Sequence, residues 1–243
     1  MILEALRLGV RYFDTAPAYE HSQDYYGAAF REAGPAARAQ VFLASKVHLR
    51  TRDKALRLLD DSLARLGTDH LDLWQLHDLR DSSELDVVFG PGGAIEAALQ
   101  AQADGRVRFI GLTGHHDPGV LLAAMRRFPF DCVLCPLNPA DPRRLPFAST
   151  VVAEARVRGM GVVGMKVMAA GQLLADRTAT AAELIRYAAS LADTAIIGCS
   201  SIEEVRANVE VAAAFHPMDA AERTALERRI AGRAARYDTF KVA

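Results

Sequence analysis

The stretch VFLASKVHLRTRDKALRLLDDSLARLGTDHLDLWQLH, residues 41–77, contains one strand–helix–strand unit. The runs at 41–46 and 71–76 are short and almost continuously apolar, which is typical of parallel strands buried on both faces. The segment 53–67 between them places leucines at helical spacing, and Gly67 then supplies a helix stop. This unit predicts a parallel sheet that is covered by helices.

The same alternation continues on both sides of this unit. Segments with helical periodicity separate five further apolar runs, at 10–14, 107–112, 131–135, 161–166 and 194–198. One helical segment opens with Asp117 and Pro118, an N-cap residue followed by proline at the first helical position. The order of elements predicts an α/β protein, a (β/α)8 TIM-type parallel barrel with only seven strands evident.

The start of the chain departs from the barrel pattern. Residues 1–8 have a helical pattern, whereas an eight-stranded barrel with this order begins on a strand. The first strand is therefore predicted to be missing, and its loss would expose two ladder edges. We interpret the chain either as a fragment or as a barrel with unusual closure. Since no linker interrupts the pattern, a single barrel domain is expected over residues 1–243.

Composition excludes several classes of partner. The 243 residues are 51% hydrophobic, enough for one large core, and the formal net charge is only -1. Scattered Lys and Arg residues give no electrostatic footprint for nucleic acid or an anionic membrane. No apolar stretch reaches the roughly 20 residues that cross a bilayer, and no signal peptide is evident. Three cysteines are too few for a disulfide framework. We expect a cytoplasmic protein with a small-molecule partner.

Four polar residues follow the ends of successive predicted strands. Asp14 and Tyr19 follow the first run, Lys46 ends the second, and His77 ends the third. In a parallel barrel the carboxyl ends of the strands converge on one mouth, so these side chains can meet around one substrate. Taken singly, each has an ordinary structural explanation as a turn residue, a half-buried aromatic, a solvated strand end or a structural histidine. Their shared position favours a catalytic site.

An ordered set of motifs resembles the aldo-keto reductase family over nearly the whole chain. The motifs are FDTAPAY (13–19), SK (45–46), RLGTDHLDLWQLH (65–77), GRVRFIGLTG (105–114) and IIGCSSIEEVRANV (196–209). LTGHHDP (112–118) and GVVGMKV (161–167) are most similar to a branch of predicted oxidoreductases, some of which carry an iron–sulfur segment. Because no cysteine follows Cys199, no such cluster is expected here.

The resemblance implies an oxidoreductase that uses NADPH to reduce a small aldehyde, ketone or similar carbonyl compound. Hydride transfer to a carbonyl creates an alkoxide that must be protonated, and the resemblance assigns Tyr19 as the proton donor. It further implies that the ammonium of Lys46 stabilises the phenolate and that Asp14 holds Lys46 in place. A neutral His77 would donate a hydrogen bond to the substrate oxygen.

The resemblance also implies a cofactor site. The residues that align with the family's adenosine-phosphate segment are Gly198, Ser200, Ser201 and Asn208, and a helix N-terminus at this point suits an anion. Ser201 with Glu204 is equally a capping box, which needs no ligand. The resemblance implies NADP as the cofactor. NAD stays open as an alternative, because Gly198 and Glu204 occupy positions where the family commonly has basic residues and only Arg206 is close in sequence.

The nicotinamide is expected to contact Thr113, Gly114, Asn138 and Lys166. Two departures from the commoner family pattern fall here: Thr113 and Gly114 replace a Ser-Asn pair, and Leu134 replaces a glutamine.

Two further residue groups have simpler explanations. His115, His116 and Asp117 are adjacent, and adjacent side chains rarely converge on one metal ion, so no metal site is predicted. Cys132 and Cys135 lie three apart on a strand, where they point to opposite faces and act as small buried hydrophobes.

Two alternative functions stay open at this point. One is a cofactor-binding or regulatory barrel with little or no turnover, because the first strand is absent. The other is an unrelated phosphate-binding barrel such as an isomerase, against which the four strand-end residues argue. The physiological substrate and the oligomeric state are not evident from the sequence.

Overall fold

A computed structural model describes residues 1–241, so the last two residues of the predicted 1–243 domain lie outside the described part. The chain divides into two compact units. The first consists of Met1–Thr113 with Arg127–Asp131, and the second of Gly114–Arg126 with Cys132–Ala243. Among residues 1–241, no helix is both long and apolar enough to cross a membrane.

The first unit is built on four parallel strands. They are β1 (Tyr12–Asp14), β2 (Phe42–Val47), β3 (Leu71–Leu76) and β4 (Val107–Thr113), hydrogen-bonded in that order. The register places Asp14 opposite Ala44 and Lys46 opposite Gln75. Each strand lies within two residues of its predicted bounds, so the strand predictions for this unit are confirmed.

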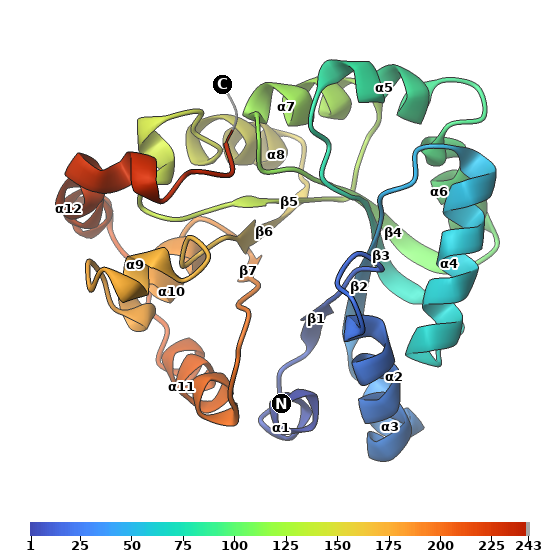
Figure 1. The fold of residues 1–243 in the computed structure, drawn as a ribbon, viewed down its shortest axis with the longest axis horizontal. Coiled ribbons are helices and arrows are strands. Elements are labelled where there is room, and N and C mark those ends of the chain that lie inside the picture. Colours follow the sequence, from blue (N-terminus) through green and yellow to red (C-terminus); the bar gives the residue numbers. More distant parts are fainter. Residues whose placement is uncertain (242–243) are drawn as a thin grey trace. The chain divides into compact units, whose positions relative to one another are not determined.

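The helices of the first unit are α1 (Ile2–Arg7), α2 (Ser22–Ala33), α3 (Pro35–Arg38), α4 (Arg52–Leu66), α5 (Ser82–Phe89) and α6 (Ala94–Ala103). Helix α1 accounts for the helical pattern at residues 1–8. Helix α4 is the predicted helix, and Gly67 ends it in the left-handed conformation at φ 64°. Its buried face includes Leu59, Leu63 and Leu66. Figure 1 shows α2, α4 and α6 along the outside of the sheet, with α4 between the other two.

The second unit contains three parallel strands, β5 (Cys132–Pro136), β6 (Gly161–Met165) and β7 (Thr194–Ala195). Strand β7 is shorter than the predicted run at 194–198. Ile196 still donates to the carbonyl of Gly164, but the following residues form the loop that leads into the next helix. With the four strands of the first unit, residues 1–241 contain the seven predicted strands.

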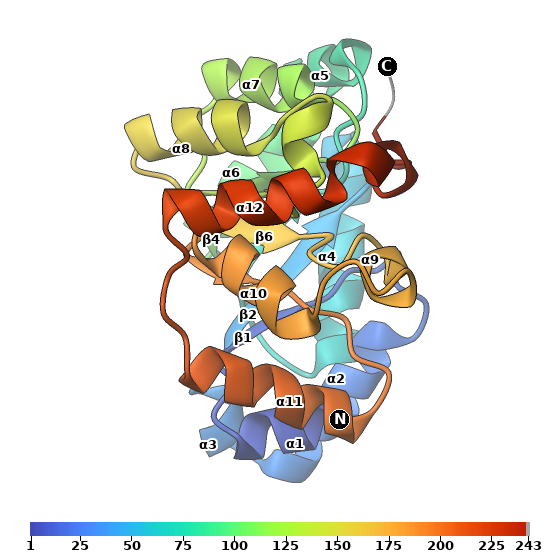
Figure 2. The same cartoon turned by 90° about the vertical axis from the view of Figure 1, so that its left-hand side faces the viewer.

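Helices α7 (Pro118–Arg127), α8 (Ala153–Val157), α9 (Gln172–Ala175), α10 (Ala181–Ala189), α11 (Ile202–Ala213) and α12 (Ala220–Ile230) follow or separate these strands, with short helical turns at Asp141–Arg143, Ala148–Val152 and Ala231–Arg236. Helix α7 begins as predicted, because Asp117 accepts a 2.7 Å hydrogen bond from the amide of Gly119. Figure 2 shows α10 beside α11, and α10 also packs against β6 and β7.

The second unit contains a buried ion pair that was not predicted from the sequence. Lys241 Nζ lies 2.6 Å from Asp141 Oδ1 and donates to the carbonyl of Arg144 at 2.7 Å, and both charged side chains are almost fully buried. Cys132 and Cys135 are both buried on β5. Burial raises the pKa of the Cys135 thiol, which keeps it protonated and fits its role as a small hydrophobe.

Candidate active site

Asp14 and Lys46 form a buried ion pair at the carboxyl end of the first unit's sheet. The ammonium of Lys46 donates to Asp14 Oδ1 and, at 2.9 Å, to the backbone carbonyl of Thr15. The exposed fractions of the two side chains are 1% for Lys46 and 4% for Asp14. Burial raises the pKa of Asp14, and the charge and hydrogen bond of Lys46 partly offset that rise. The pair fixes the ammonium at one place with little freedom to move.

Tyr19 lies in the turn after β1, directly beside this pair. Lys46 Nζ is 4.8 Å from the centre of the Tyr19 ring, and the imidazole of His77 is 5.7 Å from that ring in an edge-to-face arrangement. Tyr19 is 43% exposed, so part of this residue is open to solvent. The structure therefore brings together all four residues that the strand ends predicted.

His77 is held as a neutral imidazole. Its pKa is lowered from 6.5 to about 3, first because the ring is largely buried and second because the positive charge of Lys46 is near. A neutral imidazole can donate one N–H hydrogen bond to a substrate oxygen without carrying charge.

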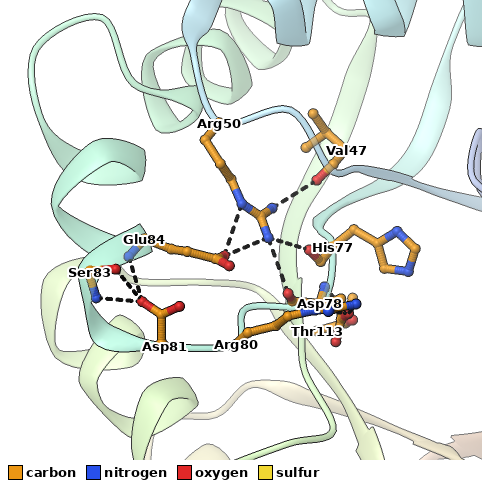
Figure 3. Close-up of polar contacts among 9 residues, drawn as sticks. All are labelled: Val47, Arg50, His77, Asp78, Arg80, Asp81, Ser83, Glu84 and Thr113. Atoms are coloured by element: carbon orange, nitrogen blue, oxygen red, sulfur yellow. Dashed lines mark hydrogen bonds and ion pairs between the residues drawn. The ribbon is translucent and has the colours of Figure 1, made fainter.

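Two polar residues beside these four were not predicted from the sequence. Gln75 on β3 donates to Asp14 Oδ2 at 3.3 Å, which adds a second partner to the buried carboxylate. Arg50, in the loop after β2, donates to the backbone carbonyl of His77 at 2.8 Å (Figure 3). The one available sequence signal for Arg50 was its position four residues after Lys46, at the same end of the sheet.

The residues that were expected to contact the nicotinamide belong to both units. Thr113 ends β4 in the first unit, and its hydroxyl accepts from the amide of Asp78 at 3.2 Å. Thr113 itself is almost fully buried, at 1% exposed. Gly114 begins the second unit, where its amide lies 3.4 Å from the carbonyl of Leu134.

Asn138 and Lys166 are neighbours in the second unit. Asn138 Nδ2 donates to the carbonyl of Lys166 at 3.0 Å, and Asn138 Oδ1 accepts from the amide of Ala140 at 3.0 Å. Lys166 has a positive φ of 54°, and its ammonium lies 5.9 Å from the ring centre of Phe240. Asn138 thus holds the backbone at the end of β6, where Lys166 begins the following loop.

The four residues expected to hold the adenosine phosphate gather at the N-terminus of α11. Ser201 is the N-cap and accepts from the amide of Glu204 at 3.1 Å. The carboxylate of Glu204 turns to Ser200, accepting from its amide at 2.7 Å and from its hydroxyl at 3.0 Å. The expected capping box is therefore only half correct, because the returning carboxylate bonds to Ser200 and not to Ser201. Asn208 Nδ2 reaches the sulfur of Cys199 at 3.3 Å, between Gly198 and Ser200 in the chain.

The family model for the aldo/keto reductase family matches residues 1–183 of this chain. The chain belongs to the aldo/keto reductase family. A similar curated protein is methylglyoxal reductase DkgB of Escherichia coli O157:H7, 28% identical over 176 residues. That match covers 71% of this chain but 62% of the relative, so the chain spans less than two thirds of the relative's length.

Solved members of the family have the same fold. Aldo-keto reductase AKR11C1 from Bacillus halodurans superposes with a TM-score of 0.77 at 24% identity, covering 93% of this chain and 84% of that one. The Bombyx mori aldo-keto reductase AKR2E4, solved in complex with NADP, gives a TM-score of 0.73 at 17% identity, covering 94% of this chain and 81% of that one. The α/β parallel-barrel class predicted from the strand order is confirmed.

Proposed function

We propose that this aldo/keto reductase is an NADPH-dependent oxidoreductase that reduces a small aldehyde or ketone, with Tyr19 as the proton donor. The observation that carries the proposal is the buried Lys46–Asp14 pair, which holds an ammonium 4.8 Å from the ring of an exposed tyrosine. A fixed positive charge beside a phenol stabilises the phenolate that forms when the proton leaves.

The roles of the four side chains follow from charge. As the carbonyl carbon is reduced, its oxygen gains negative charge and takes the proton from the Tyr19 hydroxyl. Lys46 stabilises the phenolate that remains, and Asp14 prevents the ammonium from moving toward solvent. The neutral imidazole of His77 donates a hydrogen bond to the same substrate oxygen and orients it.

A bound nicotinamide cofactor supplies the hydride for this reaction. We assign its phosphate contacts to the N-terminus of α11, where Ser200 already donates two hydrogen bonds to the carboxylate of Glu204. Donors that hold a carboxylate are suited to a phosphate oxygen as well. Support for NADP comes from the family and from the NADP complex of the Bombyx mori relative. The charge of Glu204 opposes a 2′-phosphate at this position, so NADH must be compared with NADPH directly.

Titration of the purified chain with NADPH and, separately, NADH tests the cofactor assignment, and quenching of the fluorescence of the buried Trp74 reports binding. Micromolar binding, followed by turnover in a screen that begins with methylglyoxal and simple aldehydes and ketones, would support the proposal. Tight binding without turnover of any carbonyl compound would instead favour a cofactor-binding protein. A folded chain that binds neither nucleotide would contradict both functions.

A further inference from the structure

Arg50 lies in the loop after β2, and its guanidinium joins the carboxyl ends of two strands (Figure 3). It donates to the carbonyl of His77 at 2.8 Å and to that of Asp78 at 3.1 Å, both just after β3. It also lies 3.4 Å from the carbonyl of Val47, the last residue of β2. The side chain is only 18% exposed. One planar group therefore ties the end of β2, which carries Lys46, to His77 and Asp78, which follow β3.

Glu84 holds the guanidinium in this orientation. Its Oε2 accepts from Arg50 Nη2 at 2.7 Å and from Nε at 3.1 Å. Glu84 stands in the first turn of α5, and Asp81 caps that turn by accepting from the amides of Ser83 and Glu84. The helix start thus fixes the carboxylate, and the carboxylate fixes the arginine (Figure 3).

The residue after His77 is held in an uncommon backbone conformation. Asp78 has a φ of 54°, in the left-handed region that non-glycine residues rarely occupy. Its carbonyl is bonded to Arg50 and its amide to the hydroxyl of Thr113. Such a conformation is strained and persists only where the surrounding contacts enforce it. Arg50 enforces it by binding the carbonyl of Asp78, and Thr113 enforces it by accepting from the amide of Asp78.

Figure 3 shows the consequence for the imidazole. The carbonyl of His77 faces Arg50, while its side chain points away from the guanidinium. Fixing the carbonyl and the following peptide fixes the direction in which the Cα–Cβ bond leaves the strand end. We propose that Arg50, held by Glu84, is a positioning residue that aims the imidazole of His77 at the substrate oxygen. This inference rests on the proposed carbonyl-reducing function.

The charge of Arg50 supports the same role. Burial is the main cause of the lowered pKa of His77. Among the charged and titratable groups near its ring, Lys46, His48 and Arg50 lower the pKa further and Asp78 raises it, with Arg50 the smallest of these causes. Removal of Arg50 would both release the backbone and remove one of these charges. The pKa of His77 is then expected to rise slightly, because burial and Lys46, its main causes, remain.

Replacement of Arg50 tests the proposal. Arg50→Met is expected to lower kcat about 10- to 100-fold, the range associated with misplacing a reacting group by about 1 Å, while cofactor affinity stays unchanged. Arg50→Lys keeps the charge, but a single ammonium does not span the carbonyls of both strands, so most of the loss is expected to persist. If Arg50→Met fails to fold, Arg50→Lys carries the test. Arg106→Met is the matched control, because Arg106 is also a partly buried arginine held in ion pairs, in its case with Asp60 and Asp104.

The imidazole resonances of His77, assigned by comparison with His77→Asn, provide a readout that does not depend on turnover. Changed nitrogen shifts in both folded Arg50 variants and a raised His77 pKa in Arg50→Met, with unchanged spectra in Arg106→Met, would support positioning. Wild-type kcat and unchanged His77 resonances in Arg50→Met would overturn it, and so would full recovery of kcat by Arg50→Lys. If the wild-type chain reduces no carbonyl compound, the proposed function fails, whereas the resonances still decide whether Arg50 fixes the imidazole.

Discussion

At the scale of single residues, the site depends on charges placed where water cannot reach them. Asp14 and Lys46 each lose most of their hydration on burial, and their mutual contact compensates for that loss. The four strand-end residues could be predicted because a polar residue that ends an apolar run is conspicuous in a sequence. Arg50 and Gln75 could not be predicted in the same way, since their partners are a backbone carbonyl and a carboxylate that only the fold brings near.

Lys46→Met is expected to remove turnover and to lower the free energy of unfolding by about 3–5 kcal/mol, because it leaves the carboxylate of Asp14 buried without its cation. Urea unfolding monitored by fluorescence measures the stability change. The exposed Lys54 on α4 provides the control variant Lys54→Met. A double variant, Asp14→Asn with Lys46→Met, should recover part of the lost stability but none of the turnover. An unfolding free energy unchanged by Lys46→Met would contradict the buried-pair interpretation.

The lowered pKa of His77 makes the stability of the folded chain depend on pH. Its pKa in the folded chain is about 3, because of burial first and Lys46 second, against an ordinary value of 6.5. As the pH falls from 6.5 toward 3, the unfolded chain takes up a proton at this residue that the folded chain does not. The free energy of unfolding therefore decreases on acidification through this window.

Replacement of His77 isolates that contribution. Between pH 3 and 6.5, His77→Asn should flatten the pH dependence of the unfolding free energy. His216→Asn, at an exposed position, should leave that dependence unchanged. Chemical unfolding at a series of pH values measures both. Equal slopes in the wild type and His77→Asn would show that the imidazole is not held neutral by burial.

At the scale of the elements, the strands and the helix faces followed directly from periodicity, while helix-to-helix contacts did not. Strand β7 and the contact between Glu204 and Ser200 are two places where the structure departs from the sequence prediction. Both lie in the segment that leads into α11, where loop geometry rather than hydrophobic patterning decides which donor meets which acceptor.

Gly27 in α2 identifies a close approach of α2 to α4. A Cβ at this position would lie 2.1 Å from the backbone carbonyl oxygen of Arg65, so Gly27→Ala should force the two helices apart. We expect a loss of about 1–3 kcal/mol in unfolding free energy, despite the higher helix propensity of alanine. Gly232→Ala is the control, since a Cβ there meets no atom within 4 Å. A Gly27→Ala variant as stable as the wild type would rule out this packing.

At the scale of the whole molecule, the seven strands were predictable because each one repeats a simple apolar pattern. The family was predictable because its characteristic motifs occur in order along the sequence. The single domain over residues 1–243 stays a prediction. The buried pair of Lys241 and Asp141 was not predictable, because its members lie 100 residues apart and a charged residue near the end of a chain is usually solvated. That pair ties the last described residue to the loop after β5.

Cofactor binding should stabilise the folded chain as a whole. A ligand that binds only the folded state, at a concentration 100 times its dissociation constant, raises the unfolding free energy by about 2.7 kcal/mol. Thermal and urea unfolding with NADPH or NADH measure this effect, and hydrogen exchange should show added protection at the start of α11. The absence of any shift with either nucleotide would contradict the cofactor assignment.

We propose that Tyr19 protonates the reduced carbonyl beside the Lys46–Asp14 pair. The most direct measurement compares NADPH-dependent turnover of an accepted carbonyl substrate by the wild type and by Tyr19→Phe, with cofactor affinity measured on both. We predict that kcat falls by about 100- to 10,000-fold, the usual contribution of a general acid, while NADPH affinity is retained. Tyr19→Phe turnover equal to that of the wild type would show that another group supplies the proton.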